Sequence, residues 1–175
     1  MIALPGAWLL PVLLLVAQAS PPTSGPVDTI RQATWETHRD HYVPSPLCAR
    51  SEATLWSCAA DGREYALCAS PVVDRVTGHL QYRASDAGGT VFEYPADKRP
   101  PAGAFTFRLH AGGDATVEFV DDGRRYTLLD ALRGESFVEV EAPDGRSSRT
   151  ACGGNQTLQL NYTLRLMYDA GLWER

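Results

Sequence analysis

The segment over residues 54–70 constrains the fold of this chain more than any other stretch. Two runs with alternating apolar side chains are joined there through Asp61 and Gly62, and the segment carries two of the four cysteines. An Asp-Gly pair in this setting indicates a β-hairpin, because tight hairpin turns need positive φ angles, which glycine adopts without steric cost. We expect the other strands to assemble on this hairpin.

The pattern after residue 70 keeps a period of two and is broken about every eight to twelve residues by turn-forming residues, as in antiparallel β proteins. Three Asp-Gly dipeptides, at 61–62, 122–123 and 144–145, predict three tight hairpins. The predicted fold is mainly β, an antiparallel sandwich or barrel built from hairpins with short flanking helices. The further strands are expected at residues 79–85, 90–94, 104–110, 115–121, 124–129, 137–142 and 146–152.

The flanking segments carry helical spacing. Residues 27–42 place apolar side chains on one helical face, and Pro44 would end such a helix. Residues 158–168 fit a strand, since apolar side chains occupy alternate positions, and also fit a helix. We expect a strand-like start there, followed by a short helix over 164–170.

Residues 1–19 have no charged side chain, contain an apolar run over 7–16, and end in Ala-Gln-Ala. These features indicate a signal peptide cleaved after Ala19, because the run is shorter than the ~20 apolar residues of a membrane-spanning helix. We expect residues 20–47 to form a partly disordered leader with a short helix, and residues 48–175 to form a single β-rich domain. The predicted location is periplasmic or secreted, with no membrane span after cleavage.

An even number of cysteines in an exported chain predicts disulfides. Their spacing does not match structural zinc sites. With a two-residue turn, Cys58 would face Tyr65 and Cys68 would face Leu55, which puts these two cysteines on opposite faces and beyond bonding distance. Cys152 is then the natural partner for one of them. The four disulfide candidates are Cys48, Cys58, Cys68 and Cys152.

The charges exclude several classes of function. The 21 acidic and 16 basic residues give a net charge of -5. The sequence lacks the basic stripe expected of a nucleic-acid-binding protein, so we predict no nucleic-acid partner. Lys98 is the single lysine, and this bias toward arginine is typical of a GC-rich bacterial genome. His38 and His41 lie in a run that we interpret as a solvated face, so we predict no metal and no cofactor.

Short segments of this sequence resemble two known groups of proteins. W-S-C-A-A-D-G-R-E-Y-A-L-C-A-S at 56–70, G-H-L-Q-Y-R at 78–83, and F-E-Y-P with a downstream A-F-T-F are similar to an uncharacterised family of small exported bacterial β proteins. The aromatic-x-Cys-x-x-x-Gly start at Trp56 and the late cysteine resemble the β-barrel inhibitors of C-type lysozymes. Because those inhibitors link their first strand to the C-terminal region, this resemblance implies a Cys58–Cys152 bond, which leaves Cys48 for Cys68.

The functional prediction is an exported envelope or periplasmic protein that binds an unknown protein or envelope polymer without catalysis. The polar and aromatic run Gln81, Tyr82 and Arg83 is the predicted binding site, and no catalytic residue is assigned, since no nucleophile motif is present. One alternative is a lysozyme-inhibitor-like protein, and a purely structural envelope protein is another. A third is a hydrolase of envelope polymers whose carboxylates would be Glu64, Glu93 and Glu118.

Overall fold

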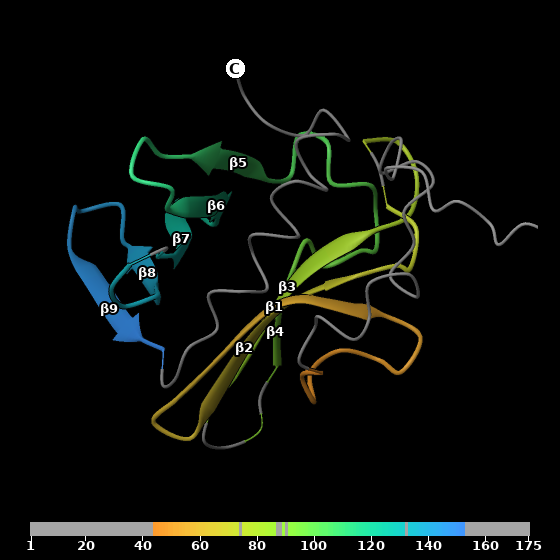
Figure 1. Ribbon diagram of the computed structural model, residues 1–175, viewed down its shortest axis with the longest axis horizontal. Helices are drawn as coiled ribbons and strands as arrows, with labels where there is room; N and C mark the ends of the chain where they lie inside the picture. Colours follow the sequence, from red (N-terminus) through yellow and green to blue (C-terminus); the bar gives the residue numbers. More distant parts are fainter. Residues whose placement is uncertain (1–43, 74, 87–88, 90, 132, 153–175) are drawn as a thin grey trace, which may run out of the picture.

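A computed structural model of the chain describes residues 44–73, 75–86, 89, 91–131 and 133–152 (Figure 1). Within these ranges the protein has nine strands and no helix. The helices expected at 27–42 and 164–170 lie outside the described residues, as does the ambiguous segment 158–168. The strands are β1 Ala53–Ala60, β2 Arg63–Ala69, β3 Leu80–Ser85, β4 Val91–Tyr94, β5 Thr106–Leu109, β6 Ala115–Asp121, β7 Arg124–Asp130, β8 Phe137–Glu141 and β9 Ser147–Ala151.

The strands form two antiparallel sheets, with orders β1-β2-β3-β4 and β5-β6-β7-β8-β9. Figure 1 shows them as two separate groups, orange to green for the first and green to blue for the second. Every neighbour in each sheet is also a neighbour along the chain, so each sheet is a meander of hairpins. The fold is therefore mainly β, as predicted, and it is a sandwich rather than a closed barrel.

Two of the predicted hairpin turns have the expected geometry. Asp61 and Gly62 have φ angles of 53° and 72°, and Asp122 and Gly123 have 47° and 71°. Two successive positive φ angles characterise the type I′ turn, whose twist matches that of the flanking strands. The third Asp-Gly pair lies in a longer loop, because the last paired residue is Ala142, whose N–H donates to the Arg146 carbonyl at 2.8 Å.

The first hairpin contains a β-bulge that the alternation did not reveal. Cys58 faces Tyr65 as predicted, but Cys68 faces Thr54 and not Leu55, since the register shifts between Thr54 and Trp56. The extra residue resets the alternation, so that Leu55 and Trp56 both reach the hydrophobic core. The prediction that Cys68 faces Leu55 is therefore wrong, although the two cysteines do lie on opposite faces of the sheet.

One hydrophobic core fills the space between the sheets. Large apolar side chains from both sheets are completely buried in it, as expected for alternating strands whose inward residues interdigitate. Aromatic rings meet across the interface, with the Tyr82 and Phe119 centroids 5.1 Å apart. The largest apolar side chains of this core that are completely buried are Trp56, Leu67, Leu80, Tyr82, Phe107, Val117 and Leu128.

Two disulfides join Cys48 to Cys68 and Cys58 to Cys152, with Cα–Cα distances of 5.4 and 5.1 Å. This is the pairing that the lysozyme-inhibitor resemblance implied. The first bond ties the segment before β1 to β2, and the second ties β1 to the residue after β9. Two disulfides in one small domain indicate that the chain folds in an oxidising, extracytoplasmic environment.

Candidate functional site

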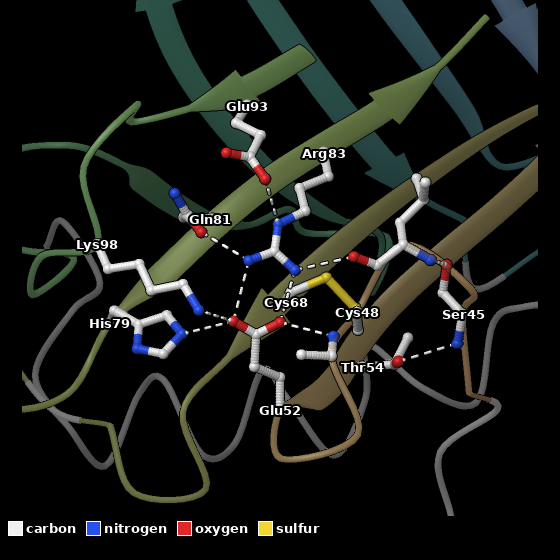
Figure 2. Close-up of a disulfide and its surroundings, with 12 residues drawn as sticks. Ser45, Cys48, Glu52, Thr54, Cys68, His79, Gln81, Arg83, Glu93 and Lys98 are labelled. Carbon is white, nitrogen blue, oxygen red and sulfur yellow. Dashed lines mark hydrogen bonds and ion pairs between the residues drawn. A yellow bond between two sulfur atoms is a disulfide. The ribbon is translucent and has the colours of Figure 1, made fainter. Parts of the chain in front are cut away.

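The outer face of the first sheet, opposite the core, is covered by residues 44–52, which we call the N-terminal loop. The Cys48–Cys68 bond holds this loop on the middle strands (Figure 2). The Ser45 N–H also donates to Thr54 Oγ1 at 3.0 Å. Ser45 is buried, whereas Pro44 and Pro46 on either side of it are exposed.

Glu52 ends the N-terminal loop and is the centre of a polar network. Its carboxylate accepts two hydrogen bonds from the Arg83 guanidinium, at 2.5 and 2.9 Å. Lys98 Nζ lies 2.7 Å and His79 Nε2 lies 2.9 Å from Glu52 Oε1. The Ala49 N–H completes the set at 2.8 Å. Figure 2 shows these groups converging on one carboxylate, which is only 2% exposed.

The electrostatics of this network favour the ionised carboxylate. Burial alone would raise the pKa of Glu52, but the hydrogen bonds from Arg83, Lys98, Ala49 and His79 outweigh it and hold the pKa well below its ordinary value of 4.5. The same contact with Glu52 raises the pKa of Arg83. The loop is therefore held by a buried ion pair as well as by a disulfide.

Arg83 contacts three further groups. Its Nη1 donates to the Leu47 carbonyl at 2.8 Å, and its Nη2 donates to Gln81 Oε1 at 2.7 Å. Its Nε lies 3.1 Å from Glu93 Oε1, an ion-pair contact without the alignment of a hydrogen bond. One side chain on β3 thus connects the N-terminal loop, its own strand and β4.

The predicted binding run Gln81, Tyr82 and Arg83 is buried. Gln81 is 1% exposed and donates to the Pro95 carbonyl at 2.9 Å, while Tyr82 points into the aromatic core. Burial raises the pKa of Tyr82 well above its ordinary value. The two polar side chains of this run hold the N-terminal loop and the loop after β4.

The carboxylates of the hydrolase alternative lie on different sheets. Glu64 and Glu93 are on the outer face of the first sheet, since they alternate with the core residue Tyr65 and with Tyr94. Glu118 is on β6 of the second sheet, where it pairs with Arg125 at 3.8 Å. These three residues do not form one constellation.

A second buried carboxylate, Asp130, ends β7 and has no cationic contact among the ion pairs of the described part of the chain. Ser136 Oγ donates to its Oδ1 at 3.0 Å. Burial raises the pKa of Asp130 to about 7, opposed by the Ser136 hydrogen bond and increased by Asp114. The Ser136 carbonyl accepts a hydrogen bond from the Cys152 N–H at 2.9 Å. Ser136 therefore connects the Asp130 carboxyl to one end of the Cys58–Cys152 bond.

The second sheet also forms a half-open pocket of about 450 Å³, where β5 and the loop before it meet β6 and β7. Three arginines reach it from three elements: Arg75 from the β2–β3 loop, Arg108 from β5 and Arg125 from β7. We call this the arginine pocket. Its remaining wall includes Glu118 and the residues Tyr94, Ala104, Phe105, Thr106, Phe119 and Val120.

The sequence analysis missed both Glu52 and the arginine pocket. Glu52 precedes the first hairpin without any motif, and Arg75, Arg108 and Arg125 are separated by more than fifteen residues each, so no local spacing connects them. The only available signal was the excess of arginine over lysine, which was interpreted as a property of the genome.

Comparison of the chain with protein-family models, with curated proteins and with solved structures gives no match. The two resemblances therefore stay predictions. The described residues contain no group of three or more histidine, cysteine, aspartate or glutamate side chains arranged to hold a metal ion. Among the same residues, no helix is long and apolar enough to cross a membrane.

Proposed function

We propose that the protein is an exported bacterial binding protein, periplasmic or secreted, that holds its ligand in the arginine pocket and catalyses no reaction. The observation that carries this proposal is the convergence of three arginines from distant parts of the chain on one hollow of about 450 Å³. A volume of this order is typical of pockets that bind whole small molecules or the end of a polymer.

The chemistry of the pocket favours binding over hydrolysis. The one carboxylate among the lining residues of the described chain is Glu118, and Arg125 lies 3.8 Å from it. Glycoside hydrolysis in most families uses two carboxyl groups on either side of the scissile bond. Arginine side chains stay protonated and donate hydrogen bonds, so they suit recognition better than proton transfer.

Export is supported by two independent features. Residues 1–19 have the composition of a signal peptide, and the two disulfides require an oxidising compartment to persist. The rigid sandwich would position the pocket, because the three arginines are attached to a strand, a strand and a loop of one domain.

The test is affinity chromatography of a bacterial envelope extract on the immobilised full chain. We expect a ligand that is retained by the wild type and by Arg63→Ala, an exposed arginine on the first sheet, and lost from Arg108→Ala/Arg125→Ala. Failure of the wild type to retain anything that the double variant loses would refute the proposal. Shortening of a retained polymer during incubation would identify an enzyme instead.

A further inference from the structure

We propose that the Cys48–Cys68 bond is a reversible redox site, at which an external thiol attacks Cys48 while the protein stays folded. The bond lies between the N-terminal loop and β2 (Figure 2). It shares no residue with the lining of the arginine pocket, so this site is separate from the one proposed above. All four cysteines are in disulfides, and the two bonds differ in access and in what holds the chain around them.

Access is the first difference, because only one of the four cysteines is partly exposed. Cys48 lies in the N-terminal loop, next to the exposed residues 49–51. Cys68 is 0% exposed, and Cys58 and Cys152 are 1% and 6% exposed in the hydrophobic core. A thiolate must reach the sulfur that it attacks, so access limits the rate of exchange. Cys48 is therefore the end of its bond that a thiol attacks, and Cys68 is the leaving group.

The second difference is that hydrogen bonds hold the chain on both sides of Cys48. The Leu47 carbonyl accepts from Arg83 Nη1 at 2.8 Å. The Ala49 N–H donates to Glu52 Oε2 at 2.8 Å, and Glu52 is itself paired with Arg83. Opening the bond should therefore leave the two thiols near their present positions, where the Cα atoms are 5.4 Å apart. The bond can then form again without a search through unfolded conformations.

The Cys58–Cys152 bond has neither property. Both of its cysteines belong to the hydrophobic core, and it joins β1 to a residue 94 positions later in the chain. A thiol would reach it when the two sheets separate. Its reduction should therefore accompany unfolding, since the long loop that it closes constrains the whole sandwich. One bond of this protein is permanent in the folded state, and the other is exchangeable.

The exchange is a transfer between sulfur atoms. A thiolate attacks Cys48 Sγ and forms a mixed disulfide with it, and Cys68 leaves as a thiolate that takes up a proton. When the attacking group belongs to a dithiol, its second thiol then attacks the mixed disulfide and releases Cys48. The dithiol is oxidised to a disulfide as the protein bond is reduced. The chemical class of the partner is therefore a dithiol, either a small molecule or a cysteine pair of another protein.

The first experiment treats the folded full chain with dithiothreitol or with reduced thioredoxin, quenches the exchange with acid, and labels the free thiols in denaturant for peptide mapping. We expect Cys48–Cys68 to open at least about tenfold faster than Cys58–Cys152, with an unchanged circular dichroism spectrum. Oxidised glutathione should restore the bond after the reductant is removed. Faster opening by thioredoxin at equal thiol concentration would identify a protein dithiol as the more effective partner.

A matched pair of variants tests which sulfur is attacked. Cys68→Ser leaves Cys48 as a free thiol, and Cys48→Ser leaves Cys68. When both folded variants are incubated with oxidised glutathione, Cys68→Ser should form the glutathione adduct at least about tenfold faster. Equal rates would overturn the assignment of Cys48. In the wild type, opening of both bonds together, or opening of Cys48–Cys68 only in urea, would overturn the proposal whether or not the variants fold.

Discussion

Glu52 and Asp130 are two buried carboxylates, each near one of the two disulfides, but their hydrogen-bond partners differ in kind. Glu52 receives Arg83, Lys98 and His79 around its two oxygens. Asp130 receives one hydroxyl, that of Ser136. Burial lowers the stability of a charge in both cases, so the partners decide whether the pKa falls, as for Glu52, or rises, as for Asp130.

The difference shows what each carboxylate does for the fold. The ionised Glu52 binds the N-terminal loop to β3, because the loop cannot leave without separating a buried ion pair. Asp130 makes no comparable ion pair among the described residues. Ionisation of its buried carboxyl at the end of β7 therefore destabilises the fold. The first sheet is thus joined to the N-terminal loop by an ion pair and by the Cys48–Cys68 bond. At the end of the second sheet, Cys152 is joined to β1 by the Cys58–Cys152 bond, and Asp130 adds no ion pair there.

The largest expected effect concerns the disulfides themselves. Cys58 and Cys152 are separated by 94 residues and Cys48 and Cys68 by 20. In the chain-entropy model the longer loop stabilises the fold by about 4 to 5 kcal/mol and the shorter one by about 3 kcal/mol. We expect Cys58→Ala/Cys152→Ala to lose more stability to urea than Cys48→Ala/Cys68→Ala.

The polar network sharpens this prediction. Because Glu52 also holds the N-terminal loop, loss of Cys48–Cys68 should leave the loop on the sheet, with limited change in hydrogen exchange of the β3 amides. An equal or larger loss of stability in Cys48→Ala/Cys68→Ala would contradict the comparison and would show that the disulfide, rather than the ion pair, fixes the loop.

The second prediction is for Glu52→Gln, which leaves the Arg83 charge buried without its carboxylate. We expect a loss of about 3 kcal/mol or more in the free energy of unfolding, measured by urea denaturation at pH 7. Glu135→Gln, at an exposed glutamate in the loop before β8, is the matched control and should change stability little.

A double variant tests whether the pair or the single charge matters. Glu52→Met/Arg83→Met removes both ions and should recover much of the stability lost in Glu52→Gln, since two apolar side chains can replace a buried ion pair. If the double variant is as unstable as the single one, the contacts of Arg83 with Leu47 and Gln81 matter more than its pairing with Glu52.

The hairpins could be predicted from the sequence because their cause is local. Asp61-Gly62 and Asp122-Gly123 specify their turns through φ alone, and alternation specifies the inward face of each strand. The bulge at Leu55 could not be predicted in this way, since it depends on how Leu55 and Trp56 pack together against the other sheet. The strands could therefore be predicted from the local pattern. The register between β1 and β2 could not, because tertiary packing shifts it at the bulge.

The polar residues were harder to assign for a related reason. Gln81 and Arg83 occupy alternate positions on β3, which is the pattern of a solvent-facing row, and they were predicted to meet a partner. They are buried because residues 44–52 and the loop after β4 cover that face, and a covering loop leaves no periodic signal in the strand that it covers. The arginines of the pocket converge only after the two sheets have packed.

The smallest expected effect is the pH dependence that Asp130 imposes. Its pKa is raised from 3.8 to about 7, so the folded state binds more protons than the unfolded state across this interval. Stability from this group is therefore greatest below about pH 4 and is lost as the pH rises toward 7. Asp130→Asn cannot ionise, and it should be more stable than the wild type at pH 8 by about 1 kcal/mol after allowance for solvent screening.

Urea denaturation at pH 5 and pH 8 measures this effect, with Asp97→Asn at an exposed aspartate as the control. We expect the advantage of Asp130→Asn to shrink at pH 5, where the wild-type carboxyl is protonated in the fold.

Glu52 acts with the opposite sign, because its depressed pKa makes stability fall as the pH drops below 4.5. The contributions of these two carboxylates therefore run in opposite directions with pH, and Asp130→Asn should remove the loss of stability between about pH 4 and 7 that comes from Asp130. A variant that is no more stable than the wild type at pH 8 would show that Asp130 finds compensation for its charge when ionised.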